Sequence, residues 1–234
     1  MLRNAKQPPE RQEKIVTSQA APIPDTAPIE KLGDIRFRAL LGAQQWALLP
    51  PAVQQRFSKR VAGGRTVVYK GKVTATAFSR AGFALAHLLR LIGSPLPISR
   101  ATGNPSVVSV TEDAASGGQF WTRLYVRERG FPQVIHSVKR FAGPTGLEEA
   151  VGFGIVMALR LSVVDGALVF SSADYALCIG HCRISLPKWI TPGALTVTHE
   201  EIDAATFRFT LTLRHTVFGT LVHQEAVYSE ETPA

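Results

Sequence analysis

Most of the chain after Gly64 alternates apolar with polar residues, the pattern of β-strands that bury one face. In residues 207–214, for example, Phe and Leu occupy one side of the expected strand, and Arg and Thr occupy the other. The pattern predicts about nine strands, at residues 66–78, 106–111, 119–127, 133–141, 150–164, 167–179, 194–202, 207–214 and 221–229. Asp165-Gly166 is typical of a two-residue hairpin turn between two of them.

A long apolar helix is predicted over Arg80–Ile92, with Ser79 as its N-cap and Gly93 as its stop. Its polar residues form one narrow stripe, so we expect the rest of its surface to be covered by the sheet. Two alternatives remain open: the helix and the sheet leave no cavity between them, or the helix lies on a membrane surface. Short helices are predicted at residues 35–41 and at 50 or 51–57.

The predicted fold class is therefore α+β and mainly β. We expect a single strongly curved antiparallel sheet or an open barrel of about nine strands, enclosing or packed on one apolar helix, with short N-terminal helices. The chain has 234 residues, 45% of them hydrophobic, which is sufficient for one core. Residues 34–230 are predicted to form this single domain. Residues 1–33 are rich in proline and lack an apolar period, so they are predicted to be a disordered tail.

Charge is distributed unevenly along the chain. Residues 35–100 contain eleven Lys and Arg residues and no acidic residue, within a chain whose net charge is +8. If this N-terminal half of the domain forms one face, it would attract anions, and an anionic lipid surface is a candidate partner. Nucleic acid is the weakest candidate, because the basic residues are not interleaved with aromatic ones. An ordinary solvated basic surface is the plain alternative.

The chain contains no recognisable catalytic motif, and neither a cofactor nor a metal is predicted. Cys178, His181 and Cys182 could supply three zinc ligands, but a fourth ligand is missing, and two reduced thiols are the simpler interpretation. Neither a secretory signal nor a transmembrane segment is recognised, so the expected location is cytoplasmic. The sequence does not indicate an oligomeric state.

The concave face of the sheet is the predicted site, and its expected ligand is an apolar or amphipathic, lipid-like small molecule. The candidate wall residues are Phe83, Leu88, Phe207, Phe209 and Leu211, and the candidate polar anchors are Arg123, His136 and Tyr175. A competing hypothesis is an enzyme, similar to cone-shaped isomerases and cyclases, in which His136 or Asp174 moves a proton.

Several short segments carry a resemblance to a known family. They include the block Phe37–Gly42, Tyr69-Lys70-Gly71, Trp121-Thr122-Arg123, the hairpin Asp165–Leu168 and Phe218–Val222. With these segments the chain resembles the bacterial family called domain of unknown function 4166, over nearly all of residues 35–228. The resemblance implies kinship and no activity. Such domains look like stand-alone proteins or like C-terminal partners of saccharopine-dehydrogenase-like reductase domains.

Overall fold

The alternating segments form eleven antiparallel strands in the computed structural model, which describes residues 33–59, 61, 63, 65–93 and 96–230. The strands are β1 Thr66–Phe78, β2 Pro105–Asp113, β3 Gly118–Tyr125, β4 Gln133–Arg140, β5 Glu148–Gly152, β6 Ile155–Val164, β7 Ala167–Ile179, β8 Cys182–Ser185, β9 Ala194–Glu201, β10 Thr206–His215 and β11 Gly219–Glu230. The predicted disordered tail lies outside the described residues except for Gly33.

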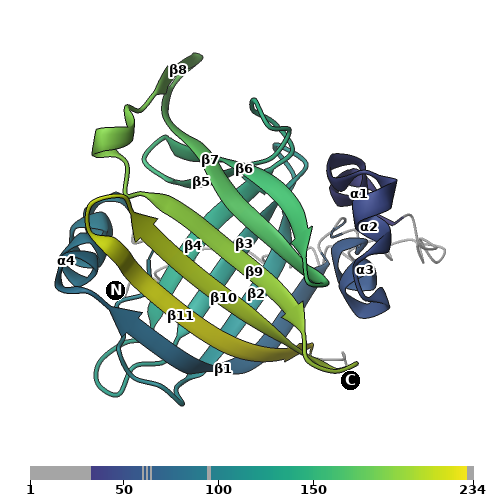
Figure 1. Ribbon diagram of the computed structural model, residues 1–234, viewed down its shortest axis with the longest axis horizontal. Coiled ribbons are helices and arrows are strands. Elements are labelled where there is room, and N and C mark those ends of the chain that lie inside the picture. Colours follow the sequence, from purple (N-terminus) through teal and green to yellow (C-terminus); the bar gives the residue numbers. More distant parts are fainter. Residues whose placement is uncertain (1–32, 60, 62, 64, 94–95, 231–234) are drawn as a thin grey trace, which may run out of the picture. The chain divides into compact units, whose positions relative to one another are not determined.

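The sheet closes on itself. Its order is β6-β5-β4-β3-β2-β1-β11-β10-β9-β7-β8, and β6 also pairs with β7 along their whole shared length. Ten strands therefore make a closed antiparallel barrel, while β8 pairs with the last four residues of β7 and extends beyond the barrel (Figure 1). The mainly β fold class is confirmed, and the expected open barrel is closed.

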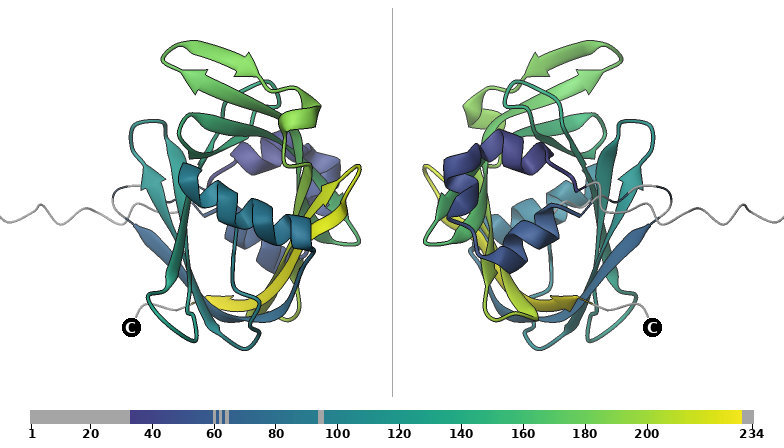
Figure 2. Two further views of the ribbon diagram at one scale, coloured as in Figure 1. Left: turned by 90° about the vertical axis from the view of Figure 1, so that its left-hand side faces the viewer. Right: turned by 90° about the vertical axis from the view of Figure 1, so that its right-hand side faces the viewer.

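Short helices lie at the two ends of the barrel. At one end, here called the α3 end, are α1 Arg36–Leu41, α2 Ala43–Ala47 and α3 Pro51–Phe57. At the other, the α4 end, α4 Arg80–Leu88 continues into the 3₁₀ turn η1 Leu89–Ile92, and the turn η2 Lys188–Ile190 follows β8. The two side views in Figure 2 show α4 across one opening of the barrel and α1–α3 across the other. None of the helices in the described residues is long and apolar enough to cross a bilayer.

The strand count exceeds the prediction of nine for two reasons. Residues 150–164 were expected to be one strand, but they divide into β5 and β6 at Phe153-Gly154, where both residues adopt positive φ angles. This is the backbone of a tight two-residue hairpin. The short β8 was not predicted, and neither was α2.

Helix α4 is less covered than its composition predicted. It spans the end of the barrel instead of lying inside it, and it contacts β11 and β1. Its buried residues are Gly82 and Ala86, whereas Leu88 is 61% exposed. The apolar side chains exceed the surface that β11 can cover, because only one edge of the helix faces the sheet.

Gly82 allows α4 to lie directly on the β11 backbone. A Cβ at this position would be 1.8 Å from the Leu221 carbonyl oxygen, so the helix could not keep its present position. We predict that Gly82→Ala lowers the free energy of unfolding by about 2 kcal/mol, although alanine is the better helix former by about 1 kcal/mol. Urea unfolding measures the effect.

The matched control is Ala84→Gly, on the exposed side of the same helix. It should lose only the helix-propensity difference of about 1 kcal/mol. A Gly82→Ala protein as stable as the wild type would contradict the close packing of α4 on β11.

Candidate ligand-binding site

A cavity of about 210 Å³ lies inside the barrel toward the α4 end. Most of its wall is aliphatic or aromatic, and the charged residues that line it are Arg123 and Glu149. Strands β3 to β7 and β9 and β10 supply most of the wall, and η1, residues 96–97 and the segment around η2 supply the rest. The lining residues are Leu89, Ile92, Leu96, Pro97, Arg123, Tyr125, Ile135, Ser137, Glu149, Val151, Ile155, Met157, Tyr175, Leu186, Ile190, Pro192, Leu195, Val197, Leu211 and Leu213.

Large aromatic side chains fill the other half of the barrel. Phe207 is fully buried and stacks on His199 with the ring centroids 4.5 Å apart. Phe209 and Tyr228 pack around this pair. We call Phe207, Phe209, Tyr228 and His199 the aromatic plug. The plug separates the cavity from α1–α3, so a molecule in the cavity has its free space toward the α4 end.

His199 belongs to the plug and not to a reactive site. The Arg56 guanidinium donates a hydrogen bond from Nη1 to His199 Nε2 over 2.8 Å, so the ring proton must sit on Nδ1. Burial first, and the Arg56 charge second, hold the pKa of His199 well below its ordinary value. The ring is therefore neutral at physiological pH. The charge of Arg56 is paired with Glu201 instead, with Arg56 Nη1 3.1 Å from Glu201 Oε2.

Three charged side chains meet at the deep side of the cavity. Lys139 Nζ donates to Glu149 Oε2 over 2.8 Å, and Arg123 Nη2 approaches Glu149 Oε1 at 3.4 Å. Arg123 Nη1 also donates to Ser137 Oγ at 3.1 Å. Register places Lys139 directly opposite Glu149, because β4 pairs with β5 at these positions. Arg123 pairs with Ile135, and its long side chain reaches Ser137 and Glu149 along the inner face. The cluster holds two cations and one carboxylate.

The Lys139–Glu149 pair is a buried ion pair. Burial acts to raise the pKa of Glu149, but Lys139 and Arg123 outweigh burial and lower that pKa to about 2. Burial lowers the pKa of Lys139, and the Glu149 carboxylate opposes the decrease. The Lys139 ammonium also lies 4.8 Å from the Trp121 ring centroid. Glu149 therefore bonds mainly to Lys139, and its contact with Arg123 is longer and weaker.

Tyr175 reaches the cavity because of a β-bulge. Ala158 pairs with Asp174 but Leu159 pairs with Ser172, so Ala173 is an extra residue in β7. Strict alternation places Tyr175 and Phe170 on opposite faces, whereas the bulge brings both into the interior. The Tyr175 hydroxyl donates to the Gly193 carbonyl at 3.0 Å, and burial raises the pKa of Tyr175 to about 12. This bond ties β7 to the segment that enters β9.

The predicted site residues are only partly brought together. Arg123, Tyr175 and Leu211 line the cavity. Phe209 lines smaller hollows next to it, and Phe207 is buried in the plug.

Three other predicted site residues do not line the cavity. Leu88 points to solvent, and Phe83 packs outside the barrel, where Arg100 lies 4.1 Å from its ring centroid. His136 is exposed on the outer face of β4, where its Nδ1 is 3.0 Å from Thr122 Oγ1. Asp174 is exposed as well, so the arrangement that the enzyme hypothesis requires is absent.

The sequence analysis missed Lys139 and Glu149. Choosing His136 as a candidate anchor placed the wrong face of β4 inside, because the inner residues are Gln133, Ile135, Ser137 and Lys139. A signal was present, because Lys139 lies in the predicted strand 133–141, Glu149 comes directly before the next predicted strand, and the two carry opposite charges. A lysine and a glutamate inside a barrel are only tolerated as a pair.

The basic N-terminal half does not form one face. Arg36 and Arg38 are at the α3 end, Lys70 and Lys72 lie along β1, and Arg90 is at the α4 end (Figure 1). Arg56 is buried in the barrel. The condition for a single basic surface is therefore not met by the described residues, because β1 carries the chain from one end of the barrel to the other.

The chain belongs to the family described as Domain of unknown function (DUF4166), whose model matches residues 49–227. This confirms the resemblance found in the sequence. No curated protein matches the chain. The description of the family states no activity, so the function must be argued from the cavity itself.

Removing the Glu149 charge should destabilise the barrel, because Lys139 would remain buried beside Arg123 without its carboxylate. We predict that Glu149→Gln lowers the free energy of unfolding by about 3 kcal/mol. The double variant Lys139→Met/Glu149→Gln should recover most of this loss in urea unfolding. Equal stability of the single and the double variant would show that the ion pair is not the cause.

The same pair predicts a pH dependence. The pKa of Glu149 is about 2 in the folded chain and 4.5 ordinarily, so the unfolded chain takes up this proton first as the pH falls. The contribution of Glu149 to stability is complete above pH 4.5 and is lost as the pH falls toward 2. The stability difference between wild type and Glu149→Gln should stay constant from pH 7 to pH 5 and shrink below pH 4.5. A difference that does not change down to pH 3 would contradict the lowered pKa.

Proposed function

We propose that this protein binds an amphipathic, lipid-like molecule, with its apolar body in the cavity and an anionic head group on Arg123. The observation that carries the proposal is an apolar cavity next to a charged cluster in which two cations, Arg123 and Lys139, share the single carboxylate of Glu149. The cavity exceeds the roughly 150 Å³ of an apolar cavity that accepts benzene. Its aliphatic wall suits a hydrocarbon chain.

The charge of the head group follows from the cluster. Glu149 neutralises one cation, and Lys139 is the closer of the two, so the charge of Arg123 is left incompletely balanced. The Arg123 side chain is 22% exposed and borders the cavity, whereas the Lys139 side chain is 7% exposed. A carboxylate or similar monoanion at Arg123 would restore neutrality. Guanidinium is well suited to such a group because it can donate two parallel hydrogen bonds.

Neighbouring polar groups support the same position. Tyr125 lines the cavity beside Arg123 and can donate a hydrogen bond to an oxygen of the head group. Ser137 also lines the cavity, but its hydroxyl donates to Glu149 and accepts from Arg123, so it holds Arg123 in place instead. Burial raises the pKa of Tyr125, so its hydroxyl keeps its proton at physiological pH.

Isothermal titration with two ligands of equal chain length tests the proposal. Wild type should bind dodecanoate more tightly than dodecanol. Arg123→Gln should weaken dodecanoate binding by about tenfold and leave dodecanol binding unchanged, because only the carboxylate loses a charge-assisted hydrogen bond. Leu211→Trp should weaken both ligands by filling the cavity.

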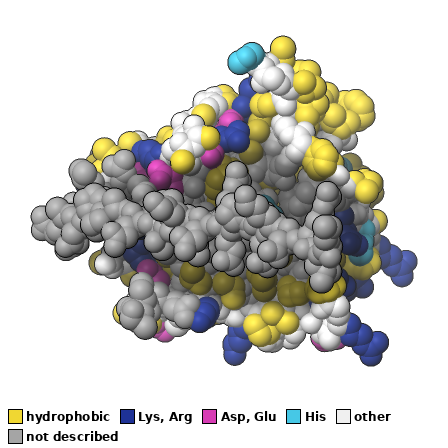
Figure 3. Space-filling view, turned by 180° about the vertical axis from the view of Figure 1, so that it is seen from behind, with side chains coloured by type: hydrophobic (Ala, Val, Ile, Leu, Met, Phe, Trp, Pro, Cys, Tyr) yellow, Lys and Arg dark blue, Asp and Glu magenta, His cyan; other side chains and the backbone are white. Residues whose placement is uncertain are grey.

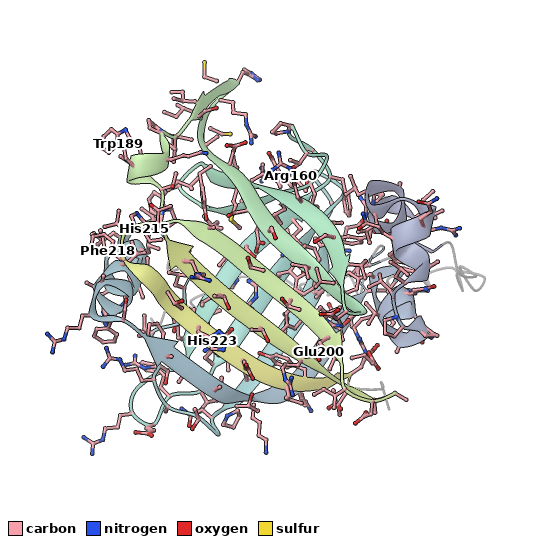
Figure 4. The ribbon with its side chains drawn as sticks, viewed as in Figure 1. Arg160, Trp189, Glu200, His215, Phe218 and His223 are labelled. Atoms are coloured by element: carbon pink, nitrogen blue, oxygen red, sulfur yellow. The ribbon has the colours of Figure 1, made fainter. Side chains whose placement is uncertain are left out.

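Arg160→Gln is the matched control, since Arg160 is exposed on β6 (Figure 4). It should leave both affinities unchanged. Binding of neither ligand to the wild type would overturn the proposal, as would equal effects of the Arg123 and Arg160 variants.

A further inference from the structure

Exposed hydrophobic side chains gather at the α4 end of the barrel. In an antiparallel barrel every second connection lies at the same end, and five segments meet here: residues 79–104, described except for 94–95, and residues 126–132, 153–154, 179–193 and 214–218. Of the sixteen large hydrophobic residues that are exposed in the described part of the chain, ten lie in these segments. Isolated exposed hydrophobics are ordinary, but this concentration at one end calls for a partner.

The most exposed of these residues are aromatic and aliphatic side chains on separate loops. Trp189 on η2 is 82% exposed, and Phe131 between β3 and β4 is 92% exposed. Leu91, Phe153 and Phe218 belong to three further segments. Figure 4 shows Trp189 and Phe218 at the same side of the molecule as α4. We call the exposed apolar residues of the five segments the apolar rim.

Basic residues accompany the apolar rim. The five segments contain eight Lys and Arg residues and one acidic residue, Glu128. Figure 3 shows hydrophobic and basic side chains together at this end, on the right in that view. At the α3 end, acidic residues such as Asp34, Asp165 and Asp203 lie among the basic ones. The positive charge is therefore concentrated where the hydrophobic side chains are exposed.

We infer that the α4 end docks on an anionic lipid bilayer, with the apolar rim entering the interface and the basic residues contacting the head groups. Aromatic side chains beside Lys and Arg are the composition of membrane-interfacial surfaces. A second copy of this chain fits poorly, because it would bring two strongly positive ends together. The cavity lies nearest this same end, which would place it next to the bilayer.

The inference goes beyond the proposed function and does not depend on it. A barrel that binds a lipid-like molecule from solution needs no apolar rim, and a barrel with an empty cavity could still dock. Vesicle binding and dodecanoate binding are therefore measured separately, and either can fail alone.

Vesicle co-sedimentation of the full chain tests the inference. We expect binding to vesicles of phosphatidylcholine and phosphatidylglycerol at 3:1, and much weaker binding to phosphatidylcholine alone. Raising the salt should weaken the binding without abolishing it, because the apolar contribution is not screened. Arg90→Glu/Lys188→Glu should reduce binding about tenfold or more. The control Arg38→Glu/Arg160→Glu makes the same charge change away from the α4 end and should have a smaller effect.

The apolar rim has its own variant pair. Trp189→Ser/Phe218→Ser should remove the salt-resistant part of the binding, whereas Phe120→Ser/Ile202→Ser, which removes exposed hydrophobics elsewhere, should retain it. Trp189 also reports insertion directly, since Trp46 and Trp121 are buried. Brominated lipid should quench wild-type fluorescence and should quench Trp189→Phe far less.

Three results would overturn the inference. They are equal binding to the two vesicle types, unchanged binding by both α4-end variants, and fluorescence that brominated lipid does not quench. The wild type could instead fail to bind vesicles and bind an acidic protein that the α4-end variants no longer bind. In that case the surface is a protein interface, and membrane docking is wrong.

Discussion

Pairing of β6 with β7 is the interaction on which the rest of the structure depends, because it turns a long sheet into a closed barrel. A barrel of about eight strands has an interior that side chains can fill, and ten strands enclose more space. This chain fills one half with the aromatic plug, where Phe207 and His199 stack. Its remaining interior is lined by aliphatic side chains that do not meet across the barrel, so closure with ten strands leaves a cavity.

Strand β7 also determines how the cavity is bounded. Its first half pairs with β9, but beyond Ser171 it leaves β9, and from Ala176 onward it pairs with β8. The wall in that region consists of Leu186, Ile190 and Pro192, supplied by residues 186–192 instead of by a strand. The Tyr175–Gly193 hydrogen bond holds this segment in place. One bulged strand thus closes the barrel, aims a tyrosine inward and leaves the α4 end to be covered by loops.

Alternation predicted most strands because each strand has one solvated face, and the Asp165-Gly166 turn followed from its dipeptide. It failed where the chain departs from a period of two. Phe153 adopts a positive φ angle that its residue type did not suggest. The bulge at Ala173 lets Phe170 and Tyr175 share the interior, which strict alternation does not allow. The face of β4 was misassigned for another reason. Lys139 is inside because Glu149 neutralises it, and that partner comes from another strand, which a pattern within β4 alone does not show.

The ion pair and the aromatic plug together determine how an amphiphile would be oriented in the cavity. Arg123 and Glu149 line its deep side, and Lys139 contacts the ring of Trp121 next to the plug. A head group held by Arg123 would therefore lie deep in the barrel, and a hydrocarbon chain attached to it could extend only toward the α4 end. That end combines exposed hydrophobic side chains with excess positive charge. An amphiphile leaving the cavity would meet an apolar surface first, so a bilayer at the α4 end would receive its chain without exposing it to water.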